Sequence, residues 1–540
     1  MTRKPRPPHN NLAGVILDRA ARVPDQLALE IPLKWDPTGI HEVQSRTYSE
    51  LAIEIAEVQA GLREVGLKRG DRVVVMFGVQ VELYALVLAL MASGMTAVLI
   101  DSGMGKKGVI QALRMSRAKA IVSLGRVLRL WPVIPNLWPL KRFAVDGRRW
   151  GVRSFEALRG AASEPDVEAL PEEYSALITY TSGTTGIPKG SDRTHDILIE
   201  QHRALSEHFP SNPGEVDMPC FPVVPLHNLA DGVTTVMPAV DYGAPATVAP
   251  HLVVEHARAA GVTRFLGAPA YLAKIGDHLL ERGESLDEVR ALICGGAPTP
   301  RKLCAQMRET FPNAERTIIY GSTEAEPIAS VSMDEFLETP GEGYLVGSLA
   351  EAASVTLVNL PDEPDLTGEG PGAYGVAAGE VGEILVSGAH VLRRYVDNPE
   401  ATKKTKLPGP DGVIWHRTGD LARWDDQGRL WLVGRLENVV QINGERIYPF
   451  TVEVEVRDLP GVECCALIEE PDGDGGLLCF TPIPGADGEE VKAMIEEWVA
   501  AAGLVNISAL PVKKIPVDPR HNSKVNRREL QRISESDETG

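Results

Sequence analysis

The chain has 540 residues, of which 44% are hydrophobic, and its formal net charge is −19 at pH 7. A chain of this length exceeds one ordinary core, so we expect a large domain and a smaller one. The acidic balance argues against a nucleic-acid partner, because Lys and Arg supply most of the affinity for phosphate backbones. We therefore expect small molecules or neutral surfaces as partners.

The six cysteines show neither CxxC spacing nor metal-ligand spacing. This pattern predicts buried thiols in a reducing compartment, without zinc or redox chemistry. The amino terminus, MTRKPRPPHNNL, is basic and rich in proline, but it lacks the apolar stretch and the cleavage site of a signal peptide. We expect a cytoplasmic enzyme.

The stretch YALVLALMASGMTAVLI (84–100) carries no charge over nearly the length of a membrane span. Ser93-Gly94 interrupts it, and the residues TAVLID that follow have the character of a strand. We favour a buried helix followed by a buried strand over a transmembrane helix.

From residue 71 onward, strand-like and helix-like segments alternate in chain order, which is typical of a parallel sheet. In the first block we expect strands at 71–78, 96–101 and 119–124, with helices at 81–93 and 106–118. A second block follows, with helices at 252–261 and 270–283, strands at 262–269, 289–298 and 316–324, and a helix capped by Thr299 with Pro300 at its first position. The βαβ repetition predicts an α/β fold with two α/β subdomains.

The later part of the chain changes character. A run rich in Gly, Pro and Asp (360–380) precedes strand-like segments at 382–388 and 428–435, which predict a β-rich subregion. From about Glu437 a short α+β module begins, and the polar tail from Ile533 is expected to be disordered. We place a large N-terminal domain at 1–435 and a small C-terminal domain at 436–540.

The strand-like segment SALITY (175–180) leads into YTSGTTGIPKG (180–190). This is not a Walker loop, in which lysine directly follows the second glycine, because Lys189 lies between Pro188 and Gly190. Glycines let backbone N–H groups turn toward an anion, hydroxyls add donors, and the lysine adds a charge. We favour a polyphosphate site over a flexible surface loop. Its candidate residues are Thr181, Ser182, Gly183, Thr184, Thr185, Gly186 and Lys189.

TSGTTGIPKG resembles the phosphate loop of the adenylate-forming superfamily, which includes acyl-CoA synthetases, nonribosomal-peptide adenylation domains and firefly luciferase. Further motifs of that superfamily occur in its order: GGAP (295–298), YGSTE (320–324), GEILVSG (382–388, with Glu383), HRTGD (416–420), Gly434-Arg435, and Lys524 in RHNSKVNRREL. The resemblance spans nearly the whole chain. It implies ATP-dependent activation of a carboxylic acid to an acyl-AMP, with release of pyrophosphate.

The resemblance also implies roles for residues that have ordinary structural alternatives. Tyr320, which an unremarkable core would also explain, stacks on adenine, and Gly295, Gly296 and Ala297 line the other side, where glycine lets backbone approach a flat base. Asp420, otherwise a turn residue, binds the ribose hydroxyls with its two acceptor oxygens. Arg435, otherwise a surface charge, contacts ribose or phosphate. The remaining nucleotide-binding candidates are Gly321, Ser322 and Thr323.

Two further roles concern catalysis. The resemblance makes Glu324, otherwise a solvated acid, a ligand of Mg²⁺ together with Thr184, since Mg²⁺ prefers hard oxygens. Lys524, otherwise a solvated lysine, touches the carboxylate and the α-phosphate as the acyl-phosphate bond forms, where a placed cation stabilises the transition state. In the superfamily the C-terminal domain rotates about an Asp or Lys just past Gly-Arg, and here that position is Glu437.

Several longer stretches are most similar to the olefin β-lactone synthetase branch: 98–113, 220–238, 320–329 and 515–527. In that branch the β-hydroxyl of the activated acid attacks its own carbonyl, so a β-lactone closes and AMP leaves without CoA. Two alternatives stay open. One is an AMP-forming fatty acid–CoA ligase, or transfer to an acyl-carrier protein, and the other is an inactive module that only binds ATP or acyl chains.

The sequence departs from the pattern in two places. Ser191-Asp192-Arg193 follows PKG, where a small apolar residue is usual, and His227 stands where that branch more often has an aromatic residue. His227 serves either as a base for the substrate hydroxyl or as an ordinary pocket histidine, and we list it with the catalytic candidates. FLGAPAYL (265–272) is predicted to line the same acyl pocket.

The segment RVLRLWPVIPNLWPLKRF (126–143) mixes basic residues with tryptophans and aliphatic residues. This composition fits contact with a membrane surface, but the prolines at 132, 135 and 139 prevent a long amphipathic helix. We favour an ordinary surface loop, and contact with a membrane surface or with another enzyme of the pathway stays open.

Overall fold

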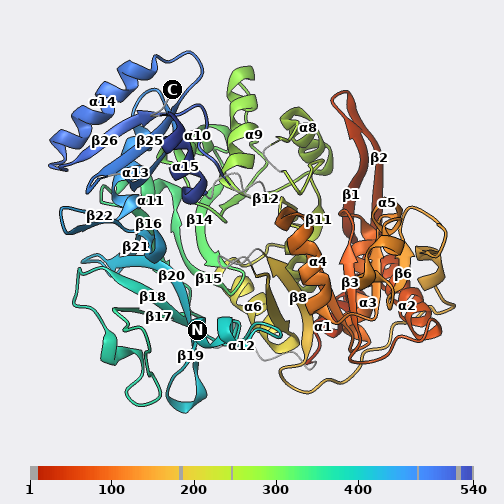
Figure 1. Cartoon of the computed structure of the whole chain (residues 1–540). Coiled ribbons are helices and arrows are strands. Elements are labelled where there is room, and N and C mark those ends of the chain that lie inside the picture. Colours follow the sequence, from red (N-terminus) through yellow and green to blue (C-terminus); the bar gives the residue numbers. More distant parts are fainter. Residues whose placement is uncertain (1–9, 182–186, 245–246, 471–472, 518–524, 538–540) are drawn as a thin grey trace.

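The computed structural model of the chain describes residues 10–181, 187–244, 247–470, 473–517 and 525–537 (Figure 1). It confirms an α/β fold with large sheets covered by helices. The early part of the chain, at the right of Figure 1, contains the first sheet, and the residues from 440 onward form small sheets at the upper left.

The first sheet has seven strands among the described residues, in the order β7-β6-β5-β3-β4-β8-β9. Neighbouring strands are parallel except for the hairpin of β8 and β9. Because β8 ends where the glycine-rich loop begins, this hairpin fixes both flanks of the loop. The strands are β3 (Arg72–Met76), β4 (Thr96–Ile100), β5 (Ala120–Ser123), β6 (Lys141–Ala144), β7 (Arg153–Ser154), β8 (Ser175–Thr181) and β9 (Lys189–Thr194).

Both faces of this sheet are buried. Val73 and Val75 of β3 belong to one apolar core and Val74 to another, as the alternation of side chains along a strand requires. The first core contains α3 (Val81–Ala92), and the second contains α4 (Gly105–Ser116). The uncharged stretch 84–100 is thus a buried helix followed by a buried strand, as predicted. No helix among the described residues has the length and apolarity needed to cross a membrane.

The second sheet joins fourteen strands of the described residues in the order β17-β18-β20-β21-β16-β15-β14-β13-β12-β10-β11-β1-β2, with β19 beside β20. Its parallel centre runs from β11 to β14 and confirms the second α/β block. The strands of the block and its flank are β1 (Leu27–Asp36), β2 (Gly39–Thr47), β10 (Val216–Pro219), β11 (Thr234–Val236), β12 (Arg264–Gly267), β13 (Ala291–Cys294), β14 (Glu315–Ser322) and β15 (Ala325–Ser332).

The helices of this block are α6 (His195–His208), α7 (Val224–Asp231), α8 (Pro250–Ala260), α9 (Pro269–Arg282), α10 (Arg301–Thr310) and α11 (Met333–Glu338). The predicted start of α10 was wrong by one residue. Pro300, with ψ of 148°, is extended and forms the N-cap, so Arg301 is the first helical residue. Thr299 is not the cap, and its hydroxyl lies 3.4 Å from the Cys294 sulfur.

The predicted β-rich subregion is the antiparallel end of the second sheet. It surrounds a small core that includes Val358, Leu366, Leu385 and Leu407. Its elements are β16 (Tyr344–Leu349), β17 (Ser354–Val358), β18 (Gly382–Ser387), α12 (Pro399–Thr405), β19 (Lys406–Pro408), β20 (Ile414–Trp424) and β21 (Leu430–Arg435).

The residues from 440 onward, here called the C-terminal part, form the predicted α+β module. It packs on the rest of the chain through Phe450, whose ring meets that of Tyr344 edge-on, and through Lys302, which donates to the Val462 carbonyl. Of the tail from Ile533 that was expected to be disordered, residues 533–537 are helical as the end of α15, and 538–540 lie outside the described residues. Its elements are β22 (Val440–Ile442), β23 (Glu445–Ile447), α13 (Pro449–Asp458), β24 (Val462–Glu469), β25 (Gly476–Pro482), α14 (Gly488–Ala501), β26 (Ile507–Pro511) and α15 (Arg527–Asp537).

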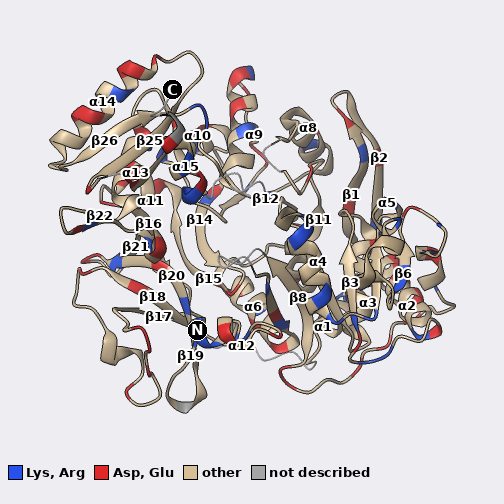
Figure 2. Ribbon diagram, in the orientation of Figure 1, with Lys and Arg blue, Asp and Glu red and all other residues tan. Residues whose placement is uncertain are grey.

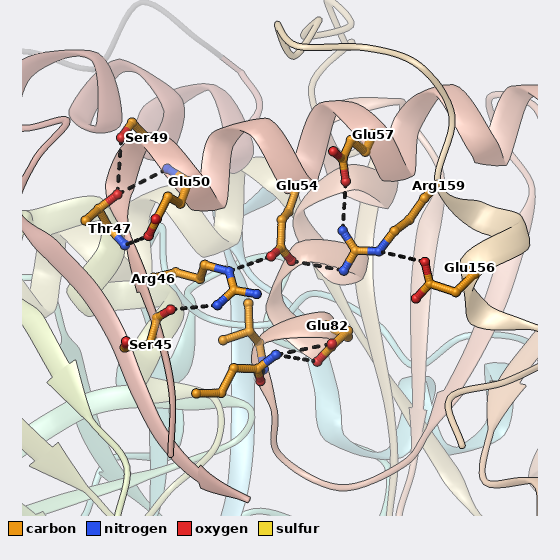
Figure 3. A network of polar contacts seen from close by, with 12 residues as sticks. Ser45, Arg46, Thr47, Ser49, Glu50, Glu54, Glu57, Glu82, Glu156 and Arg159 are labelled. Carbon is orange, nitrogen blue, oxygen red and sulfur yellow. Dashed lines mark hydrogen bonds and ion pairs between the residues drawn. The ribbon is translucent and has the colours of Figure 1, made fainter. Parts of the chain in front are cut away.

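A polar network anchors α2 (Tyr48–Glu64) against the start of the chain, where α1 (Leu12–Arg22) also packs (Figure 3). Thr47 and Glu50 form a capping box, in which each side chain accepts a hydrogen bond from the other residue's backbone N–H. The buried Glu54 carboxylate accepts hydrogen bonds from Arg46 at 2.5 Å and from Arg159 at 3.3 Å. A helix of seventeen residues is thereby fixed at its first turn and at its middle.

Candidate active site

A cleft of about 2600 Å³ is lined by residues of both large sheets and of the C-terminal part. It brings together most of the residues predicted to form the site: Thr181, Lys189, His227, Gly295, Gly296, Ala297, Tyr320, Gly321, Ser322, Thr323, Glu324, Asp420 and Arg435. Residues 182–186 and Lys524 lie outside the described part of the chain, so the roles predicted for Ser182, Gly183, Thr184, Thr185, Gly186 and Lys524 stay predictions. Val525, which follows Lys524, lines the cleft.

The segment after β13 lines the cleft with two glycines, so its backbone is not covered by side chains there. A Cβ atom added at Gly295 would lie 2.5 Å from Cγ2 of Ile319, so no larger residue fits without movement. Gly296 has φ of +84°, a conformation that favours glycine. This close approach of backbone fits a flat ring, as predicted for adenine.

Tyr320, at the end of β14, donates a hydrogen bond of 2.8 Å to Asp420 of β20. Burial, with the added charge of Asp420, raises the pKa of the Tyr320 phenol well above its usual value, so the phenol remains a donor. Asp420 also lies 3.5 Å from Nε of Arg435, at the end of β21. The two strands are neighbours in register, with Asp420 opposite Arg435. A carboxylate has two acceptor oxygens, which suits a vicinal diol.

Glu324 accepts a hydrogen bond of 2.7 Å from the hydroxyl of Tyr395. Burial raises the pKa of this carboxyl, but His416, the Tyr395 hydrogen bond and Lys406 together hold it below its ordinary value. Glu324 is therefore ionised at neutral pH. A single anionic oxygen ligand beside a polyphosphate is the arrangement that Mg²⁺ commonly uses in proteins.

Two lysines flank the ring of Tyr395, with Nζ of Lys189 at 5.5 Å and Nζ of Lys406 at 5.7 Å from its centroid. Lys406 is buried, and burial lowers the pKa of its amine to about 7, against the opposing attraction of Glu324. Its Nζ has no hydrogen-bond partner among the described residues. Our reading of the sequence missed Tyr395 and Lys406, because neither lies in a motif and only the fold brings them to Glu324.

The strand that carries Asp420 is fixed by an ion pair. Arg417 of β20 donates two hydrogen bonds to the carboxylate of Glu383 in β18, through Nε at 3.1 Å and through the terminal nitrogen at 2.6 Å. Thr418 donates to the Ile384 carbonyl, and its hydroxyl accepts from the backbone N–H of Asp420. The motifs containing Glu383 and Asp420 thus hold one another in place.

Two histidines also line the cleft, with His227 of α7 against His202 of α6 and 2.9 Å between their Nδ1 atoms. Nε2 of His202 faces Asp231, 4.0 Å from Oδ1. The Asp231 carboxylate also accepts hydrogen bonds of 3.0 Å from the hydroxyls of Ser206 and Ser211. Burial, and then His202, lower the pKa of His227 to about 3, so its imidazole is neutral. His202 was missed because 25 residues separate it from His227 in the chain.

Two other predictions are modified. Of the stretch 265–272, Leu266 lines the cleft, whereas Phe265, Tyr271 and Leu272 belong to the core. The departure at 191–193 is accommodated in β9, because Arg394 donates a hydrogen bond of 2.8 Å to the buried Asp192. Arg193 lines the cleft.

These features define a class of site. Glycines with close backbone approach, the Asp420 carboxylate beside Tyr320 and Arg435, the ionised Glu324 near two lysines, and a histidine pair line one cleft. The donor set fits ATP. The model of the AMP-binding enzyme family matches residues 17–396, more than half of the chain. The chain therefore belongs to the AMP-binding enzyme family, and it is an AMP-forming, adenylate-forming ligase.

Curated relatives and a solved structure agree with this assignment. The olefin β-lactone synthetase of Stenotrophomonas maltophilia (strain K279a) is 32% identical over 96% of this chain and 97% of its own. A feruloyl-CoA synthase of an Amycolatopsis species is 30% identical over 85% of this chain and 89% of its own. The structure of the Bacillus subtilis O-succinylbenzoate-CoA synthetase in complex with ATP and magnesium has a TM-score of 0.75, at 20% identity, and covers 95% of this chain and 99% of its own.

Proposed function

We propose that this enzyme activates a β-hydroxy fatty acid as its acyl adenylate and then closes the acyl chain to a β-lactone, releasing AMP. The observation that carries the second step is the His227–His202 pair, which lines the cleft and lies beside Asp231. The identity of 32% to an olefin β-lactone synthetase over nearly the full length supports the same choice.

In the first step a carboxylate oxygen attacks the α-phosphorus of ATP and pyrophosphate leaves. Lys189 and the hydroxyl-rich loop 181–186 hold the departing phosphates, and Lys524 neutralises the charge that develops between carboxylate and α-phosphate. Glu324 and Thr184 would hold Mg²⁺, which neutralises phosphate charge when bound. Asp420 and Arg435 hold the ribose, and Tyr320 stacks on adenine.

The tautomers of the histidine pair follow from Asp231. A carboxylate facing Nε2 of His202 favours a proton on that nitrogen, so Nδ1 of His202 carries a lone pair. Nδ1 of His227 must then donate the 2.9 Å hydrogen bond. This leaves Nε2 of His227 as an acceptor, and the ring lines the cleft. Nε2 of His227 can thus accept a proton. Burial makes this imidazole a weak base, and the Asp231 carboxylate opposes that effect because it favours the charged form. His202 and Asp231 are positioning residues.

In the second step the lactone ring closes, and every bond formed is matched by a bond broken. The β-hydroxyl oxygen attacks the acyl carbonyl carbon, the bond between that carbon and the phosphate oxygen breaks, and AMP leaves with the electron pair. The hydroxyl proton goes to Nε2 of His227. No CoA is consumed.

The domain arrangement and location belong to the same proposal. We place the domains at 1–435 and 436–540 and the hinge at Glu437, in the short turn between β21 and β22. All six cysteines are free, which supports a reducing, cytoplasmic location. The substrate is a small carboxylic acid, supplied free or by an acyl-carrier protein.

The test is mass spectrometry of the products formed from ATP, Mg²⁺ and a panel of fatty and β-hydroxy acids, with and without CoA. We expect a product one water lighter than the β-hydroxy acid, formed without CoA. A product that forms only as a CoA thioester would establish the alternative function, an acyl-CoA ligase, which the 30% identity to a feruloyl-CoA synthase favours.

The role of His227 can be tested by itself, because adenylation and lactone closure can be measured in separate assays. His227→Gln should leave ATP–pyrophosphate exchange close to wild type and slow lactone formation about 100-fold or more. His208→Gln is the matched control, since His208 lies on the same helix as His202 but pairs with Ser330 and does not line the cleft. Equal loss of exchange and lactone would make His227 a structural pocket residue.

A further inference from the structure

Exposed apolar side chains concentrate in one short stretch of the first α/β block. Among the described residues, the five most exposed large hydrophobic side chains include Val505 at 67%, and the other four lie within residues 130–150. These four are Trp150 at 79%, Val133 at 74%, Trp138 at 58% and Leu130 at 51%. Single exposed hydrophobic residues are ordinary, but four in 21 residues form a patch that needs an explanation.

The side chains of the patch are ordered by contacts within the segment. The rings of Trp131 and Trp150 stack with centroids 5.3 Å apart, and the guanidinium of Arg142 lies 4.3 Å above Trp131. One terminal nitrogen of Arg142 donates to three carbonyls, those of Leu137, Trp138 and Leu140. The indole of Trp138 donates to the Trp131 carbonyl. The exposed rings are thus held in place by contacts within the segment.

The same segment is strongly basic in an acidic protein. Residues 125–153 contain seven Lys and Arg and one Asp, a net of +6, whereas the whole chain carries −19. The fold separates the charges, because α5 (Gly125–Leu128) and β6 lie at the right of Figure 1 and the acidic α14 at the upper left (Figure 2). The basic residues are Arg126, Arg129, Lys141, Arg142, Arg148, Arg149 and Arg153.

The patch also adjoins the cleft. Leu124, Arg126 and Val127, at the start of the segment, line the cleft that holds the candidate active site. A surface docked on the patch therefore lies beside a wall of the cleft.

We propose that residues 125–153 dock this enzyme on an anionic lipid bilayer. Tryptophan prefers the boundary between water and hydrocarbon, where its ring is buried and its N–H stays wet. Arginines around it gain about 1 kcal/mol each near an anionic leaflet. The prolines at 132, 135 and 139 exclude a long amphipathic helix, and two single 3-10 turns, η2 (Trp131–Val133) and η3 (Pro135–Leu137), present the side chains instead.

A bilayer fits better than an acidic protein. Docking on a protein surface would pair arginines with individual carboxylates. Aliphatic side chains such as Val133 and Leu130 instead gain the most free energy when they are buried in the apolar part of a bilayer, where no polar partner is needed. The inference stands on this surface alone and does not depend on which acyl group the enzyme accepts.

The experiment is co-sedimentation of the full-length protein with vesicles of phosphatidylglycerol and phosphatidylcholine in equal amounts, or of phosphatidylcholine alone. We expect binding to the anionic vesicles, lost at high salt, and weaker by roughly tenfold in Arg129→Glu/Arg148→Glu and in Leu130→Glu/Val133→Glu. These variants leave Trp131, Arg142 and Trp150 intact, so the fold of the segment is kept.

One control matches the arginine variant in its change of charge, and the other introduces a single charge at a comparably exposed apolar site. Lys513→Glu/Lys514→Glu makes the same change in charge on the C-terminal part, and Val505→Glu places a charge at an exposed apolar site there. Both should bind vesicles like wild type, and all variants should keep ATP–pyrophosphate exchange with a soluble acid. Absent vesicle binding, equal binding to both vesicle types, or equal losses in the controls would overturn the proposal. Retention of the wild-type protein by a column of immobilised acidic protein, without binding to vesicles, would overturn the proposal in favour of a protein partner.

Discussion

Gly295 is the residue at which the shape of the nucleotide site is most sensitive to a single methyl group. A Cβ atom there would lie 2.5 Å from Cγ2 of Ile319, a distance that real Cβ contacts do not show. We expect Gly295→Ala to push the backbone into the cleft and to raise the KM for ATP about tenfold. Steady-state pyrophosphate exchange measures this.

The same contact supplies the control. Ile319→Ala removes the clashing methyl, so the double variant Gly295→Ala/Ile319→Ala should recover much of the ATP affinity that Gly295→Ala loses. Recovery in the double variant assigns the loss to this pair. A double variant as weak as Gly295→Ala would show that the methyl blocks the base itself.

The buried His195 makes the free energy of unfolding depend on pH in the acidic range. It is buried, its Nδ1 accepts a hydrogen bond from the backbone N–H of Leu12, and burial lowers its pKa to about 4. Between about pH 6.5 and pH 4 the unfolded chain binds a proton that the folded protein does not, so stability falls as pH falls through this window. His195→Gln keeps an acceptor for Leu12 and should flatten that loss by about 1 to 3 kcal/mol.

Denaturant titrations of both proteins at pH 7 and pH 4.5 measure the difference. His227 and His416, whose pKa values burial lowers to about 3, contribute the same direction in both proteins and cancel. An identical acid loss in wild type and variant would contradict the assignment to His195.

At the scale of elements, the capping box of α2 makes a measurable contribution to the free energy of unfolding. Thr47→Ala removes the acceptor for the Glu50 backbone N–H at the start of a long helix. We expect a loss of about 1 kcal/mol in the free energy of unfolding. Thr38→Ala, which removes an exposed hydroxyl from the turn between β1 and β2, should change it by less than about 0.5 kcal/mol. Equal effects of both substitutions would contradict the role of the cap.

The predicted elements that were correct share a cause. The strands at 72–76, 96–100 and 120–123 and the helix at 81–92 carry runs of apolar residues whose period or continuity is set by burial. The start of α10 was misplaced because helix ends depend on single hydrogen bonds, such as that of Thr299. Residues 533–537 were expected to be disordered, but they continue α15, whose Leu530 is buried in the C-terminal part.

Some residues of the candidate site were predicted from the sequence, and others were recognised only in the fold. Gly295, Tyr320, Glu324 and Asp420 stand in contiguous motifs, so the resemblance predicted their roles and the fold brings them to one cleft. Tyr395, Lys406 and His202 act across sheets and helices. Their contacts with Glu324 and His227 arise from strand order and helix packing, which local spacing does not encode.

At the scale of the whole molecule, Lys524 is predicted to link the C-terminal part to the chemistry. Lys524→Ala should reduce ATP–pyrophosphate exchange about 100-fold or more while leaving ATP affinity within about twofold. Lys513→Ala, an exposed lysine of the same part, should change neither quantity. A Lys524→Ala protein that adenylates at the wild-type rate would overturn the role of this lysine.

Rotation of the C-terminal part predicts a change in access to the hinge. Glu437 lies in a short 3-10 turn and is half exposed, with a contact of 4.0 Å to Arg435. Limited proteolysis near Glu437 should differ between the free enzyme and the enzyme with a non-hydrolysable acyl-adenylate mimic. An unchanged cleavage pattern would count against rotation at this position.

The bridge between Val517 and Val525 has a consequence for how the lysine reaches its target. Lys524 is joined to Val525 by one peptide bond, and Arg527 two residues further on is tied to Glu453 at 2.6 Å. These contacts fix Val525, the residue to which the predicted catalytic lysine is joined, on the body of the C-terminal part. We expect turnover to follow the fraction of molecules in which the C-terminal part is closed over the cleft, because the predicted role of Lys524 requires that orientation.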